Sequence, residues 1–352
     1  MRKREPLARI AGLSVANPPH VLHQKEVAER AGELFGDSLP SFGRLRPVYE
    51  NAEIETRYSC VPITWYQEQH GFGARNELYL KNAVELLEQA ALSALNKCGR
   101  SIDEIDGIVT VSSSGIATPS LDALLMERMS FRRSVQRLPV FGLGCAGGVL
   151  GLARAAQMAA SRPGSLYLFL VVELCGLTFR SRDFSKSNVI ATALFGDGAA
   201  AALVGTGIEG DGAIVASGEH TWPGTLDVMG WDVTDDGLAV VFSRDIPHHV
   251  RTKMREALDG YLAEEELTLA EHRHFLCHPG GAKVLDALEE IFDLDDGEMR
   301  HSRETLRSFG NMSAATVMFV LEAAIRDGLT GRALLSSLGP GFTAGFLSMD
   351  LT

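Results

Sequence analysis

The sequence contains few cysteines, and none of them is arranged to hold a zinc ion or a disulfide framework. The five cysteines are odd in number, scattered along the 352 residues and never spaced as Cys-x-x-Cys: Cys60, Cys98, Cys145, Cys175 and Cys277. This pattern argues against a metal site and against a secreted disulfide-rich domain. We therefore expect a protein of a reducing compartment, the cytoplasm, that holds no metal.

Long runs of like charge, long apolar runs and phosphate-binding glycine motifs are also missing. The net charge of −12 includes no charged tail, so we expect neither a nucleic-acid nor a membrane-surface partner. The most apolar stretch, residues 165–179, is interrupted by Glu173 and is too short to span a bilayer. The basic start lacks a following apolar segment, so no secretory signal is expected. Neither a dinucleotide-binding Gly-x-Gly-x-x-Gly after the first strand nor a Walker A motif occurs.

A glycine-rich turn around Cys145 is the most informative stretch that is present. Residues 142–148 read Gly-Leu-Gly-Cys-Ala-Gly-Gly and lead into a helical pattern of small and apolar residues. This predicts a cysteine on the first turn of a buried helix, where free N–H groups and the helix dipole lower the pKa of a thiol. Such a thiolate is a nucleophile. The alternative is a buried small residue, the more common role of an isolated cysteine.

Strand and helix patterns alternate along the chain, and the alternation occurs twice. Helices are predicted at residues 23–35, 76–97, 121–129, 145–156, 248–263, 283–292 and 311–325. Strands are predicted at residues 7–15, 107–111, 137–141, 167–172, 194–204, 274–277, 333–338 and 344–351, with a hairpin at 228–242. The order indicates two fused α/β halves, residues 1–207 and 208–352, with a polar site at their junction.

Two further residues occupy turns that correspond to the Cys145 turn. His278 ends a short strand before Pro-Gly-Gly, and Asn311 follows Gly310 at a predicted helix start. A histidine supplies the base that a cysteine nucleophile needs, and an asparagine amide donates to a developing oxyanion without exchanging a proton. Taken singly, His278 could be a turn histidine and Asn311 a helix N-cap. Together with Cys145 they favour a catalytic site.

The motifs around these residues resemble the type III polyketide synthases, the chalcone synthase-like enzymes. Five segments carry the resemblance, in family order and across nearly the whole chain: residues 144–148, 194–200, 278–281, 310–313 and 339–341. The resemblance implies the thiolase-like fold, an α/β architecture of two pseudo-duplicated halves in five layers (αβαβα). It also implies a homodimer that uses CoA thioesters as substrates and needs no cofactor.

The resemblance implies a role for each residue of the candidate triad, Cys145, His278 and Asn311. Cys145 would carry the starter acyl group as a thioester. His278 and Asn311 would stabilise the thioester carbonyl and the enolate formed when malonyl-CoA loses CO2. That carbanion would attack the Cys145 thioester, and the cycle would repeat before the chain cyclises.

The resemblance also implies substrate-binding positions. Phe195 matches a gatekeeper phenylalanine, while Val240 stands where the second gatekeeper would be. Trp231 replaces a glycine of the plant enzymes. Further positions assigned to the substrate are Ser113, Cys175, Thr178 and Ser313. Arg44 matches one CoA-binding residue and Arg46 is adjacent, but Pro47 and Asn51 replace two others, so an acyl-carrier-protein-bound starter remains open beside acyl-CoA.

The hairpin sequence is similar to bacterial members that extend long fatty acyl starters. The valine at position 240 would open space for an alkyl chain, so we predict an alkylresorcinol or alkylpyrone product. A ketoacyl-ACP synthase III-like enzyme making one condensation is an alternative, although that family carries His-Gln-Ala-Asn where this chain has His-Pro-Gly-Gly at 278–281. A non-catalytic acyl-thioester-binding subunit is another. The starter, the number of extensions and the ring closure stay open.

Overall fold

A single mixed sheet runs through the molecule. The computed structural model describes residues 5–36 and 38–352. The strand order is β11-β12-β13-β8-β1-β7-β6-β4-β5. The first-half strands are β1 (Ala8–Ala16), β4 (Gly107–Val111), β5 (Gln136–Val140), β6 (Leu166–Leu174) and β7 (Asp197–Gly205). The second-half strands are β8 (Gly212–Thr221), β11 (His274–Cys277), β12 (Gly331–Gly339) and β13 (Thr343–Leu351).

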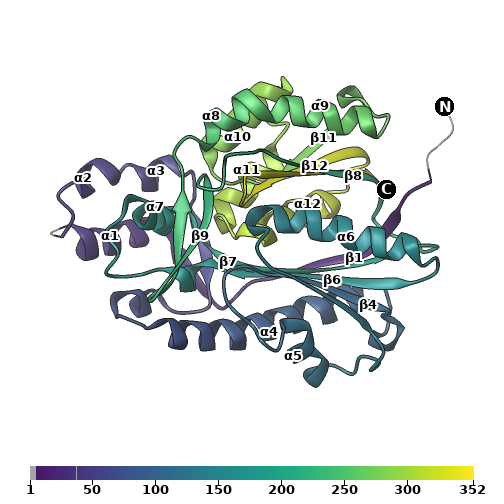
Figure 1. The fold of residues 1–352 in the computed structure, drawn as a ribbon, viewed down its shortest axis with the longest axis horizontal. Coiled ribbons are helices and arrows are strands. Elements are labelled where there is room, and N and C mark those ends of the chain that lie inside the picture. The colour runs from purple at the N-terminus through teal and green to yellow at the C-terminus, as the bar shows by residue number, and fades with distance from the viewer. Residues whose placement is uncertain (1–4, 37) are drawn as a thin grey trace.

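The first-half strands and the second-half strands form two layers. Helices cover the outer face of each layer and fill the space between the two layers, which we call the two arms of the sheet, so the molecule has five layers (Figure 1). The outer helices of the first half are α4 (Phe72–Lys97) and α5 (Leu121–Arg128). The helices between the two arms are α6 (Gly147–Ser161) and α12 (Thr316–Arg326). Those over the second half are α9 (Arg255–Glu264) and α10 (Ala282–Phe292). The predicted αβαβα architecture is confirmed.

The central position of α6 and α12 explains their composition. Both helices are buried on nearly every face, and small residues such as Gly148 and Gly151 let them approach the strands and each other. Strands β6 and β7 are buried along their whole length, since helices pack on both faces of the sheet. One core cluster of α6, α12 and the strands therefore joins the two halves.

The two halves repeat one strand-pairing pattern. β1–β7 and β7–β6 are antiparallel and β6–β4 is parallel, while β8–β13 and β13–β12 are antiparallel and β12–β11 is parallel. Strand β5 has no counterpart in the second half within the described residues. The halves meet where β1 pairs with β8 over three residues. The division at residue 207 stays a prediction, because the sheet is continuous across it.

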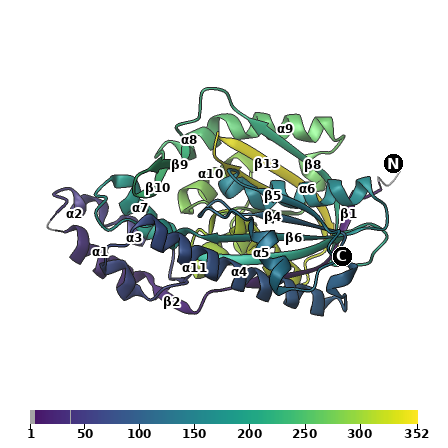
Figure 2. The ribbon, with the colours of Figure 1, turned by 60° about the horizontal axis from the view of Figure 1, so that its bottom comes forward.

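A lobe of helices and a hairpin lie at one end of the sheet (Figure 2). The lobe comprises α1 (Gln24–Phe35), α2 (Phe42–Leu45), α3 (Val48–Asn51) and α7 (Lys186–Leu194). The hairpin pairs β9 (Met229–Thr234) with β10 (Gly237–Phe242), as predicted. The remaining elements are β2 (His20–His23), β3 (Thr56–Ser59), α8 (Ile246–His249) and α11 (Arg300–Phe309). Helix α7, helix α11 and strand β8 were not predicted from the sequence.

Two predicted helix starts are too early, by two residues for α6 and by five residues for α12. Cys145 lies in a separate 3-10 turn, Gly144–Ala146, that precedes α6. Asn311 lies in an extended bridge to Phe195, and a second 3-10 turn, Ser313–Ala315, separates it from α12. Asn311 is therefore not the N-cap of the helix that follows it.

The described residues contain no helix long and apolar enough to cross a membrane. Within the same part of the chain, no group of three or more histidine, cysteine or acidic side chains is arranged to hold a metal ion. None of the five cysteines is in a disulfide.

Candidate active site

Cys145, His278 and Asn311 line one cavity, which we call the Cys145 cavity. Its empty volume is about 440 Å³, and its other walls are mostly apolar. Cys145 comes from the turn before α6, His278 from the end of β11, and Asn311 from the segment after α11. Because the two halves are duplicated, the Cys145 and Asn311 turns occupy equivalent places before α6 and α12. The structure thus brings together the three residues predicted to be catalytic.

The Cys145 turn is fixed by contact with the turn at residues 339–341. Gly144 has a φ of +46°, and a Cβ there would lie 2.5 Å from the Cδ atom of Pro340. A Cβ on Gly339 would lie 2.3 Å from the carbonyl oxygen of Leu143. Only glycine fits at both positions, because any side chain would push the two turns apart. The glycines therefore hold the cysteine in place.

The Asn311 amide is oriented by hydrogen bonds on both of its ends. Its Nδ2 donates to the carbonyl oxygen of Gly280 at 3.1 Å, and its Oδ1 accepts from the backbone N–H of Ser313 at 2.8 Å. Its backbone bonds to Leu194 and Gly196 at 2.8 and 3.0 Å. One Nδ2 hydrogen remains for a ligand, so the residue is a preorganised donor.

His278 is buried, and neither ring nitrogen has a hydrogen-bond partner within the described part of the chain. Burial lowers the pKa of its imidazole to about 3. The ring is therefore neutral at physiological pH, with one donor and one acceptor nitrogen. Unsatisfied buried polar groups are rare in folded proteins, so a ligand in the Cys145 cavity is the natural partner of this ring.

The expected thiolate at Cys145 is not favoured by its surroundings. Burial raises the pKa of the thiol to about 12, and the charge of buried Glu173 adds to the increase. Hydrogen bonds to Ser313 Oγ at 3.6 Å and to Asn311 Oδ1 at 4.0 Å oppose it only in part. The sulfur precedes α6 instead of lying in its first turn, which weakens any effect of the helix dipole. Without substrate the site holds a neutral thiol and a neutral imidazole.

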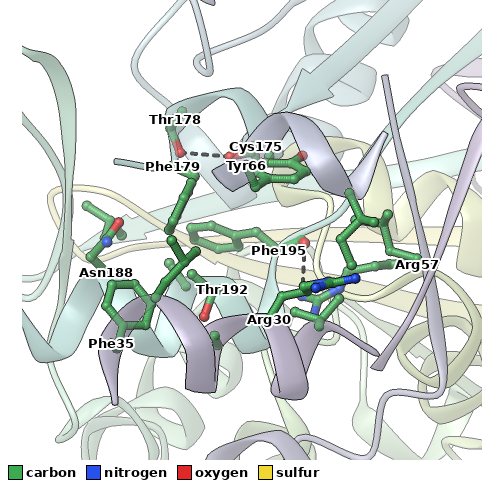
Figure 3. A pocket seen from close by; sticks show the side chains of 18 residues that line it. Arg30, Phe35, Arg57, Tyr66, Cys175, Thr178, Phe179, Asn188, Thr192 and Phe195 are labelled. Carbon is green, nitrogen blue, oxygen red and sulfur yellow. Dashed lines mark hydrogen bonds between the residues drawn. The ribbon is translucent and has the colours of Figure 1, made fainter. Parts of the chain in front are cut away.

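A second, larger cavity lies against the lobe, and we call it the α1–α7 cavity (Figure 3). Its empty volume is about 680 Å³. Four predicted substrate residues line it: Cys175, Thr178, Phe195 and Val240. Phe195 also bridges to Asn311 through the backbone, so this residue lies between the two cavities. The structure thus places the predicted gatekeeper at the boundary between the triad and an apolar space.

The other predicted substrate residues lie near these cavities without lining them. The Trp231 ring packs edge-on against Phe195, with 6.2 Å between ring centroids. Ser313 contacts the Cys145 sulfur. Ser113 donates its backbone N–H and its hydroxyl to Glu173 at 3.1 and 3.0 Å. Ser113 thus holds a buried carboxylate, and its contact with substrate stays a prediction.

The predicted CoA-binding arginines are exposed and line neither cavity. Arg44 lies in the short helix α2 and Arg46 follows it. No ion pair of either residue occurs among the described residues, so both are free to meet a phosphate. Their role in CoA binding stays a prediction.

Sequence reasoning missed much of the wall of the α1–α7 cavity. Helices α1 and α7 contribute eight of its 18 lining residues, and Arg57 and Tyr66 add polar groups. One signal was available for Arg57. It alternates with less buried neighbours along β3, so a charged residue occupies a core-facing position of a strand.

Comparison with known proteins matches the whole chain to one family. The family model for the N-terminal domain of chalcone and stilbene synthases matches residues 2–208, and the model for their C-terminal domain matches residues 213–348. A 1,3,6,8-tetrahydroxynaphthalene synthase of Streptomyces peucetius subsp. caesius is 38% identical, covering 96% of this chain and 92% of its own. Type III polyketide synthase A of Arabidopsis thaliana is 30% identical, covering 98% and 93%.

A solved structure agrees with this match. The 1,3,6,8-tetrahydroxynaphthalene synthase of Streptomyces coelicolor A3(2), described as a bacterial type III polyketide synthase, superposes with a TM-score of 0.89. The two chains are 28% identical, and the superposition covers 97% of this chain and 98% of that one.

Proposed function

Because the chain belongs to the chalcone and stilbene synthase family and is a type III polyketide synthase, we propose that it extends a fatty acyl starter. The starter is loaded on Cys145, lengthened with units from malonyl-CoA and cyclised to an alkylresorcinol or alkylpyrone. The α1–α7 cavity is the observation that supports this proposal. Membership of the family argues against the single-condensation and non-catalytic alternatives.

Loading begins from the neutral pair in the Cys145 cavity. As the sulfur attacks the thioester carbonyl, its proton passes to the acceptor nitrogen of His278, and the CoA thiolate leaves and takes up a proton. The carbonyl oxygen develops negative charge during this step. The remaining Nδ2 hydrogen of Asn311 stabilises that oxygen by donating to it.

Extension uses the same donors. Malonyl-CoA loses CO2, and the electron pair of the broken carbon–carbon bond forms an enolate whose oxygen accepts from His278 and Asn311. The enolate carbon attacks the acyl group on Cys145, which forms a carbon–carbon bond and releases the Cys145 thiolate. Neutral donors suit this step, since they stabilise the enolate without protonating its carbon.

An alkyl chain suits the α1–α7 cavity in its chemistry. Most of the lining is aliphatic or aromatic, as in most small-molecule sites, and the empty volume of about 680 Å³ is larger than that of the Cys145 cavity. Val240 lines it where a phenylalanine would occupy part of that space. A fatty acyl chain attached to Cys145 would pass Phe195 to enter the cavity.

Several finer points remain part of the proposal. Arg44 and Arg46 are exposed cations available to the phosphates of CoA or of a carrier-protein prosthetic group. The homodimer, the cytoplasmic location and the absence of a cofactor stay predictions. Five cysteines without a disulfide support a reducing compartment.

The test is to fill the α1–α7 cavity from helix α7. Ala191 lines the cavity, so Ala191→Phe should exclude long chains, while Ala191→Ser keeps the volume. We expect Ala191→Phe to slow acylation of Cys145 by long acyl-CoAs roughly tenfold or more, because each CH2 group left in water forfeits about 0.8 kcal/mol. Intact-protein mass spectrometry over a series of chain lengths measures this. Equal slowing of short and long chains would contradict the proposal.

Synthesis of a tetrahydroxynaphthalene is the second candidate, because two of the relatives above carry that product in their names. Such a product has no alkyl chain and needs no large apolar cavity. Product analysis with and without a fatty acyl-CoA separates the two candidates.

A further inference from the structure

The α1–α7 cavity contains a buried positive charge that no carboxylate contacts in the described residues. Arg57, on strand β3, is 2% exposed and lines the cavity. Its guanidinium donates to Gln24 Oε1 at 2.6 Å and to the carbonyl oxygen of Phe195 at 3.1 Å. Its Nε has no partner among the described residues. A guanidinium has five N–H donors, so three of them remain available.

No carboxylate in the described residues forms an ion pair with Arg57, which distinguishes it from other arginines nearby. Arg30, which lines the same cavity, pairs with Glu33 at 2.9 Å, and the buried Arg75 reaches Asp236 at 3.4 Å. The acid that influences Arg57 is Asp197, but its carboxylate accepts backbone N–H groups instead. Asp197 thus attracts Arg57 without contacting it, and the hydrogen-bond acceptors of Arg57 among the described residues are neutral oxygens.

The arginine is also held in place, so it does not reach solvent by turning away. A Cβ on Gly196 would lie 3.2 Å from the Arg57 Cβ, and one on Gly310 would lie 3.5 Å from it. The stem is therefore packed between two glycine turns. Burial lowers the pKa of the guanidinium to about 10, which still leaves it charged at neutral pH. A buried charge without a partner is costly, and an anion in the cavity would offset that cost.

We propose that Arg57 binds a carboxylate carried on an alkyl chain inside the α1–α7 cavity. The apolar walls hold the chain, and the guanidinium receives the anionic end (Figure 3). Two molecules present this chemistry: an ω-carboxyacyl starter attached to Cys145 by its other end, and a free fatty acid. The first extends the proposed function, on which it rests, to starters with a carboxylate at the far end of the chain.

The test compares matched pairs of CoA thioesters, an alkanoyl-CoA and the ω-carboxyalkanoyl-CoA of equal carbon number. Acylation of Cys145 is followed by intact-protein mass spectrometry in the wild type, Arg57→Met and Arg57→Lys. At chain lengths that reach Arg57, we expect the wild type to accept the carboxylate form. Arg57→Met should lower the rate of Cys145 acylation by the ω-carboxyalkanoyl-CoA, relative to the rate with the alkanoyl-CoA, by roughly 10- to 100-fold. This is the effect of losing a charged hydrogen bond. Arg57→Lys should retain part of the preference.

The ratio of the two acylation rates distinguishes an arginine that binds the carboxylate from an arginine that only supports the fold. A purely structural arginine would lower both rates equally in Arg57→Met, and that result would overturn the assignment to ω-carboxyacyl starters, as would rejection of every ω-carboxyacyl-CoA by the wild type. Arg30→Gln is the matched control, because it removes a cavity-lining charge that already has a partner. A ratio that depends on Arg30 and not on Arg57 would also overturn it. If Arg57→Met fails to fold, Arg57→Lys replaces it, and a ratio of the two rates identical to that of the wild type would then overturn the assignment.

Calorimetry with free decanoate tests whether the ligand of Arg57 is a free fatty acid. Decanoate binding that is lost in Arg57→Met, with no selectivity among the thioesters, would assign the site to free fatty acids. Absence of both decanoate binding and thioester selectivity would refute the carboxylate site. Failure of the proposed function is distinguishable, since it appears as no acylation by plain alkanoyl-CoAs of any length.

Discussion

Protonation of His278 is costly in free energy because its imidazole is buried in the active site. Its imidazole is 4% exposed, and neither nitrogen is bonded in the described residues. Burial depresses its pKa from an ordinary value near 6.5 to about 3. The folded state therefore resists taking up a proton that the unfolded chain accepts readily, and acid weakens the fold through this residue.

The pH dependence of stability follows from that shift. Because the folded pKa is lower than the unfolded one, the contribution is present above pH 6.5 and is lost as the pH falls toward 3. Relative to His278→Gln, the wild type should lose up to about 1.4 kcal/mol of unfolding free energy per pH unit in this window. Urea denaturation of both proteins between pH 7 and pH 4 measures the difference. Parallel stability curves would show that His278 is not buried as a neutral ring.

Trp231 provides a second test at the residue scale. Its ring packs against Phe195, between the triad and the α1–α7 cavity. Trp231→Gly should change the range of accepted chain lengths, while the rate of Cys145 acylation by a short acyl-CoA changes less than about threefold. Chromatography of products from acyl-CoAs of different lengths detects the shift. An unchanged product profile would count against a role for Trp231 in shaping the substrate space.

The residues of the triad could be predicted from sequence, but their protonation could not. Glycine turns and the family resemblance identified Cys145, His278 and Asn311 because such motifs are local. The raised pKa of Cys145 depends on burial and on Glu173, which lies on strand β6, outside the motif. Arg57 was missed for the same reason, since only the folded chain shows that it has no carboxylate partner.

At the scale of elements, helices α6 and α12 position both catalytic turns. Gly148 of α6 touches the segment that leads into α12, and a Cβ there would lie 2.2 Å from the carbonyl oxygen of Ala314. Because backbone atoms form this contact, no side-chain rotation can relieve it. The distance between the Cys145 and Asn311 turns therefore depends on this glycine.

Gly148→Ala should consequently destabilise the protein by roughly 2 kcal/mol or more and slow Cys145 acylation. Gly260→Ala, in the middle of α9, is the control: a Cβ there meets nothing within 4 Å. That change should stabilise the helix by up to about 1 kcal/mol. Thermal unfolding of the two variants provides the comparison. A Gly148→Ala protein as stable and as active as the wild type would refute the close packing of α6 against the segment before α12.

Periodicity predicted most elements, and the exceptions have physical reasons. Helices α4 and α10 were found because their apolar residues follow the helical period, and strands β6 and β13 because they are short, largely apolar segments. The helix after Cys145 and the helix after Asn311 were predicted too early, because a 3-10 turn has nearly the same sequence pattern as the first turn of a helix. The buried face of helix α11 consists of His301, Ser302, Thr305 and Leu306, so it gives almost no apolar signal in the sequence.

At the scale of the whole molecule, duplication explains why one site draws on both halves. Each half places a turn before its inner helix, and the two inner helices pack together in one core. The sequence contained a trace of this symmetry in the matching turns at Cys145 and Asn311. The α1–α7 cavity was not foreseeable, since residues from α1, β3, α7 and β10 meet there only through the fold.

The central claim is that Cys145 carries a fatty acyl chain through repeated condensation. The most direct measurement incubates the enzyme with dodecanoyl-CoA and 13C-labelled malonyl-CoA and analyses the products by mass spectrometry, with Cys145→Ala as control. We predict products that retain the intact alkyl chain joined to two or more labelled units in a pyrone or resorcinol ring, and none from the variant. A single β-ketoacyl product, or products built from labelled units alone, would contradict the account.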